Sequence, residues 1–300
     1  MTPTDGARRG GAGTTLRAIV RSARPRHWVK NVLVLAAPAL SGRITEPPVL
    51  VATATAFVCF CLAASGTYLV NDARDVRSDR LHPVKRHRPV AAGELSPRSA
   101  YVAGGVLIVA ALVVAGAQGW PLFLVTGSYT AISLAYCFGL KNEPLIDIVA
   151  IASGFALRAI AGGVAAGIPL SEWFILATSF GSLFMAAGKR YAEINDPNIV
   201  RGSTRVSLAS YSPTYIRFVW TLSAGVLIMT YGLWAFDRQV ALSSVLPVLS
   251  VFPFVIAVLR YAMHVDGGEA AEPEDIVARD RWLQGLGVIW VVLVALPLLG

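Results

Sequence analysis

The sequence predicts an all-α integral membrane protein with about nine transmembrane helices. Hydrophobic residues make up 55% of the 300 residues, the mean hydropathy is +0.60, and only 15% of residues are charged. A soluble domain usually carries about a quarter charged residues. Because lipid offers no partner to a free backbone amide, apolar segments of spanning length must cross the membrane as helices.

The nine expected spans follow one another with short punctuating stretches. They cover residues 30–44, 47–71, 99–117, 120–140, 145–166, 172–191, 213–235, 241–263 and 282–299. Gly, Pro and charged residues end them. SGRITEPP follows the first span, AQGWP the third, KNEP the fourth, GIPLSEW the fifth, DPNIVRGSTR the sixth, FDRQ the seventh and DGGEAAEPED the eighth. Pro38 predicts a kink within the first span.

The domain organisation expected from this pattern is simple. Residues 1–14 are predicted to be a disordered polar tail, and basic residues interspersed with apolar ones over 15–28 suit a helix at the membrane interface. Residues 15–300 are predicted to form one transmembrane domain with cytosolic loops at 72–98 and 189–212.

A secretory signal peptide is an alternative interpretation of the N-terminal region. RPRHWVK followed by VLVLAAPAL and small residues has the required order of basic, apolar and small segments. The apolar stretch begins late, however, and eight further spans would hold the chain without cleavage. We therefore expect the first span to be retained.

The net charge of +8, with a sequence pI near 9.7, has a topological explanation. In a soluble protein it would suggest nucleic acid as a partner, which we do not expect here. About seven basic residues precede or include Lys30 and about seven more lie in 72–98, whereas the opposite side holds only Arg43 and Arg238. This asymmetry predicts a multi-pass protein of the cell (inner or plasma) membrane, with a cytosolic N-terminus and an external C-terminus.

An acidic cluster follows the second span in NDARDVRSDR. Asp72, Asp75 and Asp79 are spaced i, i+3 and i+7, so they share one face of a helix, with Asn71 beside them. Two carboxylates about 5 Å apart repel by about 3 kcal/mol at an effective dielectric constant of 20. A cation must offset this repulsion, and hard oxygen ligands suit Mg²⁺, which shares its coordination shell with phosphates. The spacing therefore predicts a site for magnesium and a diphosphate.

The alternative is a solvated helix end without a metal. Arg74, Arg77 and Arg80 alternate with the aspartates and could neutralise them. The complete NDxxDxxxD pattern at the cytosolic end of a span favours the metal site.

A basic segment, HPVKRHRPVAAGELS, comes next. Lys85, Arg86 and Arg88 are candidate phosphate ligands, because Lys and Arg both bind phosphate oxygens and Arg does so with two donors. Contact with anionic lipid is the alternative for each. Prolines and Gly93 predict an ordered turn here.

The sixth expected span ends in GKRYAEIND. Lys189, Arg190 and Glu193 recur within about one helical turn, so the basic pair and the carboxylate can face one cavity. A lysine four residues before a glutamate is the weaker orientation for a helical ion pair, which makes a purely structural pair less attractive. Tyr191 is a weaker candidate for the same cavity.

Isolated polar residues in other spans add candidates. Arg158 lies inside the fifth span and must face a polar cavity or, alternatively, an interhelical hydrogen bond. Asp147 lies about 16 Å away along a straight helix, so it is not a direct partner. Lys30, Tyr136 and Lys141 stand at cytosolic span ends and are possible phosphate contacts.

These motifs resemble a known family. NDxxDxxxD followed by KRxRPxAxG is similar to the UbiA superfamily of intramembrane prenyltransferases, and the similarity extends over most of the helical chain. Members that prenylate aromatic rings carry a second aspartate-rich motif, where this sequence has KRYAE at 189–193. RPRHWVKNVLVLAAP and GKRYAE resemble the branch that transfers phosphoribosyl groups to decaprenyl phosphate.

The resemblance implies a fold and a reaction. The fold is a UbiA-type nine-helix bundle with a central cavity that opens to the cytosol and laterally to lipid, and assembly as a trimer. The reaction transfers 5-phosphoribosyl from phosphoribosyl pyrophosphate to decaprenyl (polyprenyl) phosphate, releases pyrophosphate and depends on Mg²⁺. Its product would feed arabinan precursors of the cell wall. The active site would face the cytosol.

Roles for individual residues follow from the motifs and the resemblance together. The catalytic candidates are Asp72, Asp75, Lys189 and Glu193. The magnesium ligands are Asp72, Asp75 and Asp79. The substrate-binding candidates are Lys30, Asn71, Lys85, Arg86, Arg88, Tyr136, Lys141, Arg158, Arg190 and Tyr191.

Two other functions stay open from the sequence. A UbiA-type prenyltransferase would move a prenyl group from a prenyl diphosphate to an aromatic or lipid acceptor, and the basic residues at 189–193 argue against it. A transporter would bind its substrate near the midplane in broken helices, whereas the charges here gather at one membrane face.

Overall fold

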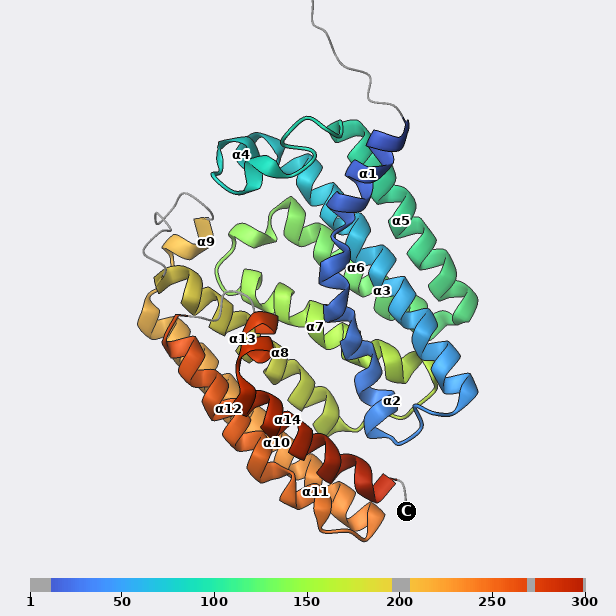
Figure 1. The fold of residues 1–300 in the computed structure, drawn as a ribbon, viewed down its shortest axis with the longest axis vertical. Helices are drawn as coiled ribbons and strands as arrows, with labels where there is room; N and C mark the ends of the chain where they lie inside the picture. Colours follow the sequence, from blue (N-terminus) through green and yellow to red (C-terminus); the bar gives the residue numbers. More distant parts are fainter. Residues whose placement is uncertain (1–11, 196–205, 269–272, 299–300) are drawn as a thin grey trace, which may run out of the picture.

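The structure is a computed structural model that describes residues 12–195, 206–268 and 273–298, and within these ranges every regular element is helical (Figure 1). The α-helices are α1 (Ala12–Ala23), α2 (Ala36–Leu40), α3 (Pro47–Arg74), α4 (Val76–Leu81), α5 (Pro97–Gln118), α6 (Trp120–Phe138), α7 (Ile146–Ala165), α8 (Glu172–Asn195), α9 (Val206–Ala209), α10 (Pro213–Leu242), α11 (Leu246–Leu249), α12 (Val251–Asp266), α13 (Pro273–Arg279) and α14 (Arg281–Ala295). The 3-10 helices are η1 (Pro25–Leu35), η2 (Lys85–His87), η3 (Leu140–Asn142) and η4 (Leu296–Leu298).

Seven helical segments of the described chain are long and apolar enough to cross a membrane. They are α3, α5, α6, α7, α10, the combined α11 and α12, and α14 with η4. The expected sixth span falls in α8, which has 24 residues and carries charged residues at both ends, so it is not among the seven. The all-α membrane fold is confirmed, and the count of nine stays a prediction.

The first expected span is interrupted. Residues 25–35 form η1 and residues 36–40 form the short α2, in place of one α-helix. Pro38 has no N–H to donate to the carbonyl of Val34, four residues earlier. That carbonyl instead presses against α7, where a Cβ added to Gly162 would lie 1.7 Å from Val34 O. The kink predicted at Pro38 is therefore a wider break, and a glycine on the neighbouring helix accommodates it.

Small residues also bring α3 and α5 together. A Cβ on Gly66 would lie 2.7 Å from Gly104 O, and one on Gly104 would lie 2.8 Å from Gly66 O. Such close approach of backbones is typical of helix packing in membranes. The contact fixes the upper part of α3, which carries the acidic cluster.

Helix starts follow the sequence closely. Ser96 accepts the N–H of Ser99 at the start of α5, and Ser212 accepts that of Tyr215 at the start of α10. Proline occupies the first turn of both helices, where its missing N–H costs nothing.

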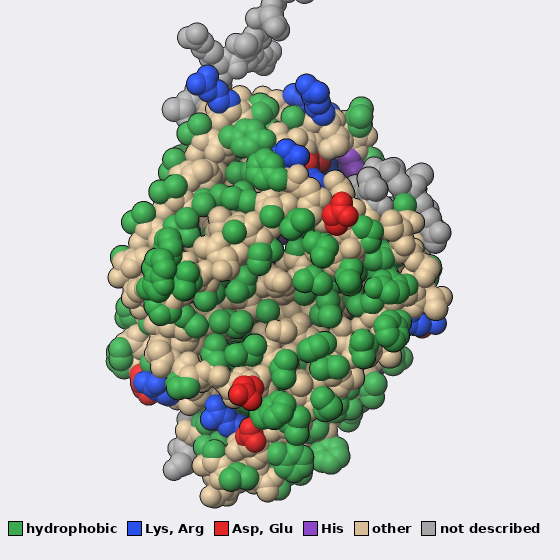
Figure 2. All heavy atoms as spheres, turned by 180° about the vertical axis from the view of Figure 1, so that it is seen from behind, with side chains coloured by type: hydrophobic (Ala, Val, Ile, Leu, Met, Phe, Trp, Pro, Cys, Tyr) green, Lys and Arg blue, Asp and Glu red, His purple; other side chains and the backbone are tan. Residues whose placement is uncertain are grey.

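The elements form one elongated bundle. In Figure 1, α1 and α4 lie at the top, α3, α5 and α6 on the right, α10, α12 and α14 at the lower left, and α7 and α8 between them. The C-terminus lies at the end opposite α1. Charged side chains on the face in Figure 2 lie mostly toward the two ends, and the broad band between them is mostly apolar, as a membrane-embedded surface requires.

Helical structure extends into the polar segments of the chain. Residues 1–11 of the predicted tail lie outside the described residues, but α1 already begins at Ala12. This helix exposes Leu16 and Val20 and buries Ala18, which suits an interfacial position. The predicted loop 72–98 contains α4 and η2, and 189–212 contains the end of α8 and all of α9, with 196–205 outside the described residues.

Candidate active site

A cavity of about 1700 Å³ lies inside the bundle. Its walls come from the 3-10 helices η1, η2 and η3 and from the α-helices α2, α3, α4, α6, α7, α8, α10, α12, α13 and α14. One part is strongly polar and includes most of the charged candidates, while another is apolar and lined by Tyr231, Trp234, Phe254 and Trp290. The expected central cavity is therefore present, and its two parts suit a ligand with an anionic head and an apolar tail.

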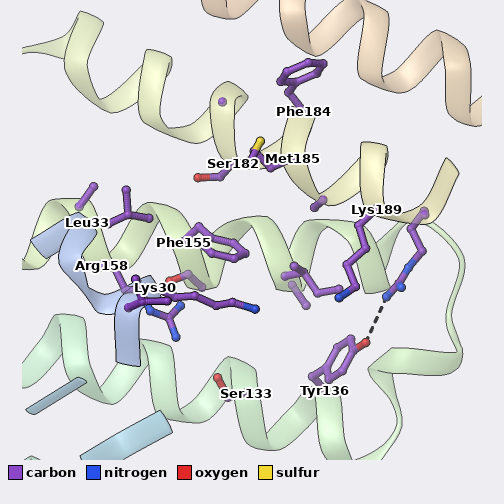
Figure 3. A pocket seen from close by; sticks show the side chains of 18 of the residues that line it. Lys30, Leu33, Ser133, Tyr136, Phe155, Arg158, Ser182, Phe184, Met185 and Lys189 are labelled. Carbon is purple, nitrogen blue, oxygen red and sulfur yellow. Dashed lines mark hydrogen bonds between the residues drawn. The ribbon is translucent and has the colours of Figure 1, made fainter. Parts of the chain in front are cut away.

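Most of the residues predicted from the sequence meet in this cavity. The candidates predicted from the sequence that line it are Lys30, Asn71, Asp75, Asp79, Lys85, Arg88, Tyr136, Lys141, Arg158, Lys189 and Arg190. In Figure 3, Lys30 and Lys189 point into the cavity from η1 and α8 respectively. Candidates separated by up to 160 positions, from Lys30 to Arg190, thus share one cavity.

The three aspartates stand where α3 gives way to α4. Helical hydrogen bonds continue through the junction, from Asp75 N to Asn71 O and from Asp79 N to Asp75 O. Asp75 and Asp79 line the cavity, whereas Asp72 is only 1% exposed and lies behind its wall. The continuous helical path keeps the three carboxylates on one side, as their spacing predicted.

Basic side chains from other segments neutralise these acids. Arg88 donates to Asp72 Oδ1 at 3.2 Å and to Asp79 Oδ2 at 2.8 Å, and Lys141 Nζ lies 2.7 and 2.6 Å from the two oxygens of Asp75. Arg24 also donates to Asp72. Each aspartate therefore has a cationic partner contributed from outside the NDARDVRSDR segment.

The arginines between the aspartates have other contacts. Arg74 donates to the carbonyl of Phe138 and lies over its ring, and Arg80 donates to the carbonyl of Ala91. The alternative in which these arginines neutralise the cluster is thus not what the structure shows for these two. The acidic side chains face inward, and these arginines support neighbouring loops.

The acidic cluster offers oxygen donors of the kind that a divalent cation binds in proteins. Among the described residues, no three or more His, Cys, Asp or Glu side chains form a preassembled metal site. Asp72 Oδ2, however, is buried without a hydrogen-bond partner, which costs at least about 1 kcal/mol. Mg²⁺ commonly takes one or two carboxylates and completes its shell with phosphate and water. The oxygen donors of Asp72, Asp75 and Asn71 fit that pattern.

Arg190 is the centre of a buried network. It is fully buried, and its Nε donates to Asp147 Oδ2 at 2.9 Å. Its other two nitrogens donate to Glu193 Oε2 at 2.5 Å and to Tyr136 Oη at 3.2 Å, the latter drawn as a dashed line in Figure 3. Glu193 does not line the cavity, and its ion pair with Arg190 helps to fix that guanidinium.

Arg158 meets both expectations made for it. Its Nε donates to Asn31 Oδ1 at 2.7 Å, Nη1 to Gly154 O at 2.6 Å and Nη2 to Tyr129 Oη at 2.9 Å. It also lines the cavity. The guanidinium is therefore fixed between η1, α6 and α7, and Asn31 ties it to the segment that carries Lys30.

Besides Asp72 and Glu193, two more candidates are not among the cavity-lining residues. Arg86 Nε donates to the ring of His87 at 3.3 Å, and neither this arginine nor Tyr191 is among the cavity-lining residues. Tyr191 is buried in the core, where its hydroxyl donates to Asp266 and accepts from Arg217. At about 3.6 residues per turn, Lys189 and Tyr191 point about 200° apart, so a cavity lined by Lys189 and Arg190 leaves Tyr191 facing the core.

His82 shapes the basic loop at the cavity edge. Its Nδ1 accepts the backbone N–H groups of Val84 at 3.2 Å and Lys85 at 3.3 Å. Burial and the nearby Lys85 ammonium lower the pKa of His82. The ring is therefore neutral at neutral pH, as an acceptor at Nδ1 must be.

Arg24 and Asp147 are site residues that the sequence did not single out. Arg24 lines the cavity, holds Asp72 and lies 4.8 Å from the ring centre of Tyr68. Its φ of 54° places a non-glycine residue in the left-handed region, an outlier typical of functional sites. In the sequence it is one of several neighbouring arginines. Asp147 carried a signal, because an aspartate within an apolar span needs a partner.

A helical membrane bundle whose cavity opposes carboxylates with basic side chains is the architecture of intramembrane transferases of the UbiA type. The model of the UbiA prenyltransferase family matches residues 31–298, and the chain belongs to this family. A solved UbiA homolog from Archaeoglobus fulgidus bound to GPP and Mg²⁺ has a TM-score of 0.71 at 16% identity, covering 93% of this chain and 98% of that one. That similarity supports the fold.

Closer relatives belong to one branch of the family. The chain is 53% identical over 280 residues to the decaprenyl-phosphate phosphoribosyltransferase of Mycobacterium tuberculosis, covering 92% of each protein. It is 50% identical over 286 residues to the protein of that name from Mycolicibacterium smegmatis, covering 91% of this chain and 90% of that protein. The resemblance noted in the motifs is thereby confirmed.

Proposed function

We propose that this protein transfers the 5-phosphoribosyl group of phosphoribosyl pyrophosphate to a polyprenyl phosphate and releases pyrophosphate. One observation carries the proposal: Lys189 and Arg190 line the same cavity as Asp75 and Asp79. Both substrates of this reaction carry phosphate beyond the leaving diphosphate, so a second basic wall is needed. The name shared by relatives about 50% identical over nine tenths of the chain supports the same reaction.

The donor's diphosphate would lie at the acidic and basic wall near the start of α4. Asn71, Asp72 and Asp75, with Asp79 in support, would hold Mg²⁺, which when bound would supply charge stabilisation for the departing pyrophosphate. Arg88 and Lys141, freed from their carboxylates as the acids bind the cation, would take phosphate oxygens. The charge of the cation would then offset part of the negative charge of the diphosphate.

The chemistry needs little beyond positioning. The bond between ribose C1 and a pyrophosphate oxygen breaks, and a bond from C1 to an oxygen of the lipid phosphate forms. The ribose gains oxocarbenium character as in glycoside cleavage. Because the lipid phosphate is already ionised near neutral pH, no strong general base is required. Lys189, Arg190 and Arg158 would hold it in line, which supplies most of the rate enhancement.

The apolar part of the cavity would take the first isoprene units of the acceptor. Trp234, Phe254 and Trp290 line this part, and Leu33 extends it on the side of η1. A polyprenyl chain is far longer than the cavity, so the rest would leave sideways between helices into lipid.

The cellular setting is part of the proposal. Basic residues at one end of the bundle favour a cytosolic N-terminus and a cytosolic mouth of the cavity in the inner membrane. The product would be a precursor of cell-wall arabinan, and the trimer expected from the resemblance stays a prediction.

A donor comparison tests the reaction. Purified protein in lipid is given either ribose-labelled phosphoribosyl pyrophosphate with decaprenyl phosphate, or labelled prenyl diphosphate with an aromatic acceptor, each with Mg²⁺. We expect a labelled lipid in the first mixture and none in the second. Label only in the second would make the protein a prenyltransferase, and metal-independent uptake into vesicles without a product would indicate transport.

A further inference from the structure

Asp147, at the start of α7, joins three separate segments. It is completely buried. Arg190 of α8 donates to its Oδ2 at 2.9 Å, and Tyr211, just before α10, donates to its Oδ1. Ser207 of α9 places its Oγ 3.3 Å from Oδ2. The Asp147 carboxylate thus connects α8, α9 and Tyr211 to the start of α7.

This junction reaches two basic side chains of the cavity. Arg190 bonds Asp147 on one side and Tyr136, a cavity residue, on the other. Ser207 Oγ also donates to the backbone carbonyl of Lys141 at 2.9 Å, and the Lys141 ammonium holds Asp75. Asp147, Ser207 and Tyr211 do not themselves line the cavity, so any effect on a substrate must pass through Arg190 and Lys141.

The turn that carries Lys141 has a strained backbone. Leu145 has a φ of 66°, in the left-handed region that costs a residue with a side chain about 1 kcal/mol or more. Its N–H donates to the hydroxyl of Tyr211. Burial and the hydrogen bond to Asp147 raise the pKa of Tyr211, so its hydroxyl stays protonated and can donate and accept at once. The shape of the turn therefore depends on this tyrosine.

We propose that Asp147, Ser207 and Tyr211 form a latch that positions Arg190 and Lys141 for substrate phosphates. These are positioning residues for the reaction proposed above, and the inference rests on that proposal. A buried ion pair is a poor source of stability compared with apolar packing. The Asp147–Arg190 pair is better explained by the fixed place it gives to a guanidinium beside the cavity.

The test compares Tyr211→Phe with Tyr215→Phe. The two rings stack with centroids 6.1 Å apart, and each variant loses only one hydroxyl. Ser207→Ala is a milder second change at the latch. Hydrogen exchange and the affinity for inorganic pyrophosphate with Mg²⁺ are measured on the whole protein, since neither readout requires turnover.

We expect Tyr211→Phe to speed amide exchange in residues 139–145 and to weaken pyrophosphate binding by about 5- to 10-fold, the value of one hydrogen bond. Tyr215→Phe should change neither quantity, and Ser207→Ala should change both in the same direction. In the transfer assay, Tyr211→Phe should raise KM for a phosphate substrate more than it lowers kcat. Combined with Lys141→Ala, it should weaken binding by less than the product of the two single effects.

Other results would overturn the latch. Equal pyrophosphate affinity in the two tyrosine variants would do so, as would faster exchange throughout the protein in Tyr211→Phe, which would mean ordinary support of the fold. The wild-type protein could fail to transfer a phosphoribosyl group while Tyr211→Phe still weakens pyrophosphate binding. That pair of results would support the latch and reject the proposed reaction.

Discussion

Three carboxylates at one helix end are tolerable because each has a basic partner from a distant segment. Arg88 contacts Asp72 and Asp79. The Lys141 ammonium contacts both carboxylate oxygens of Asp75. In such pairs, the carboxylates and the basic side chains can exchange each other for new partners. In the proposed reaction, a divalent cation would bind the carboxylates while Arg88 and Lys141 would bind phosphate oxygens. Asp72 Oδ2 has no hydrogen-bond partner, so a cation that binds this oxygen would displace no existing hydrogen bond.

The first prediction concerns Asp75. Asp75→Asn should lower phosphoribosyl transfer by at least about 100-fold, because the amide neither neutralises Lys141 nor binds a cation strongly. Asp237→Asn, on the exposed surface of α10, is the matched control and should keep normal activity. Transfer by Asp75→Asn at the wild-type rate would show that the acidic cluster has no part in the reaction.

A second prediction concerns Lys189. Lys189→Ala should raise KM for a phosphate-bearing substrate about 10-fold, since a hydrogen bond to a charged group contributes about 1.5–3 kcal/mol. Arg98→Ala removes an exposed charge from α5 and should leave the kinetics unchanged. Unaltered KM values for both substrates in Lys189→Ala would mean that this lysine binds neither substrate and only helps to orient the protein in the membrane.

Residue types were easier to predict than residue pairs. The spacing of the aspartates and the GKRYAE pattern identified most of the cavity wall, because periodicity shows which side chains share a helix face. Periodicity cannot show which helices adjoin. Arg24 looked like any other arginine of the N-terminal region, and Asp147 was compared with Arg158 on its own helix when its partner is Arg190 on α8.

At the scale of elements, η1 is the segment that apolar patterning described least well. The expected span 30–44 is almost wholly apolar from Val32 to Leu40, yet Pro38 removes one hydrogen bond and Gly162 lets the Val34 carbonyl approach α7. Hydropathy records neither effect. The longer helices were predicted closely, because their ends carry serine caps and prolines that act locally.

The third prediction tests this contact. Gly162→Ala should lower the unfolding temperature in detergent, because overpacking of this kind costs about 1–3 kcal/mol or more. Gly105→Ala, where an added Cβ meets nothing within 4 Å, should be neutral or stabilising, as alanine favours a helix interior. A Gly162→Ala protein as stable as Gly105→Ala would mean that η1 does not pack on α7 in this way.

At the scale of the whole molecule, the charge asymmetry of the sequence and the acidic cluster of the cavity indicate the same end of the bundle. The basic N-terminal region and the acidic cluster lie near the same end of the bundle, and the C-terminus lies at the other (Figure 1). Composition alone was enough for the membrane class. The shared cavity needed the three-dimensional arrangement, since no sequence pattern shows that every expected span except the third lines one space.

The fourth prediction is the orientation of the bundle. Leu81 is 89% exposed in α4, and Leu81→Cys should react with a membrane-impermeant maleimide only in inside-out vesicles. Glu46, whose side chain is 43% exposed before α3, is the counterpart: Glu46→Cys should react in intact cells. The three native cysteines are buried and give little background. The reverse labelling pattern would invert the proposed topology.

The most direct measurement of the central claim follows two labels of one donor. Phosphoribosyl pyrophosphate labelled in the ribose and, separately, in the β-phosphate is incubated with the protein, Mg²⁺ and decaprenyl phosphate. We predict that the ribose label enters the lipid, that the β-phosphate label leaves as pyrophosphate, and that chelating the metal stops both. If neither label moves, or if the β-phosphate label enters the lipid, phosphoribosyl transfer is not what this cavity catalyses.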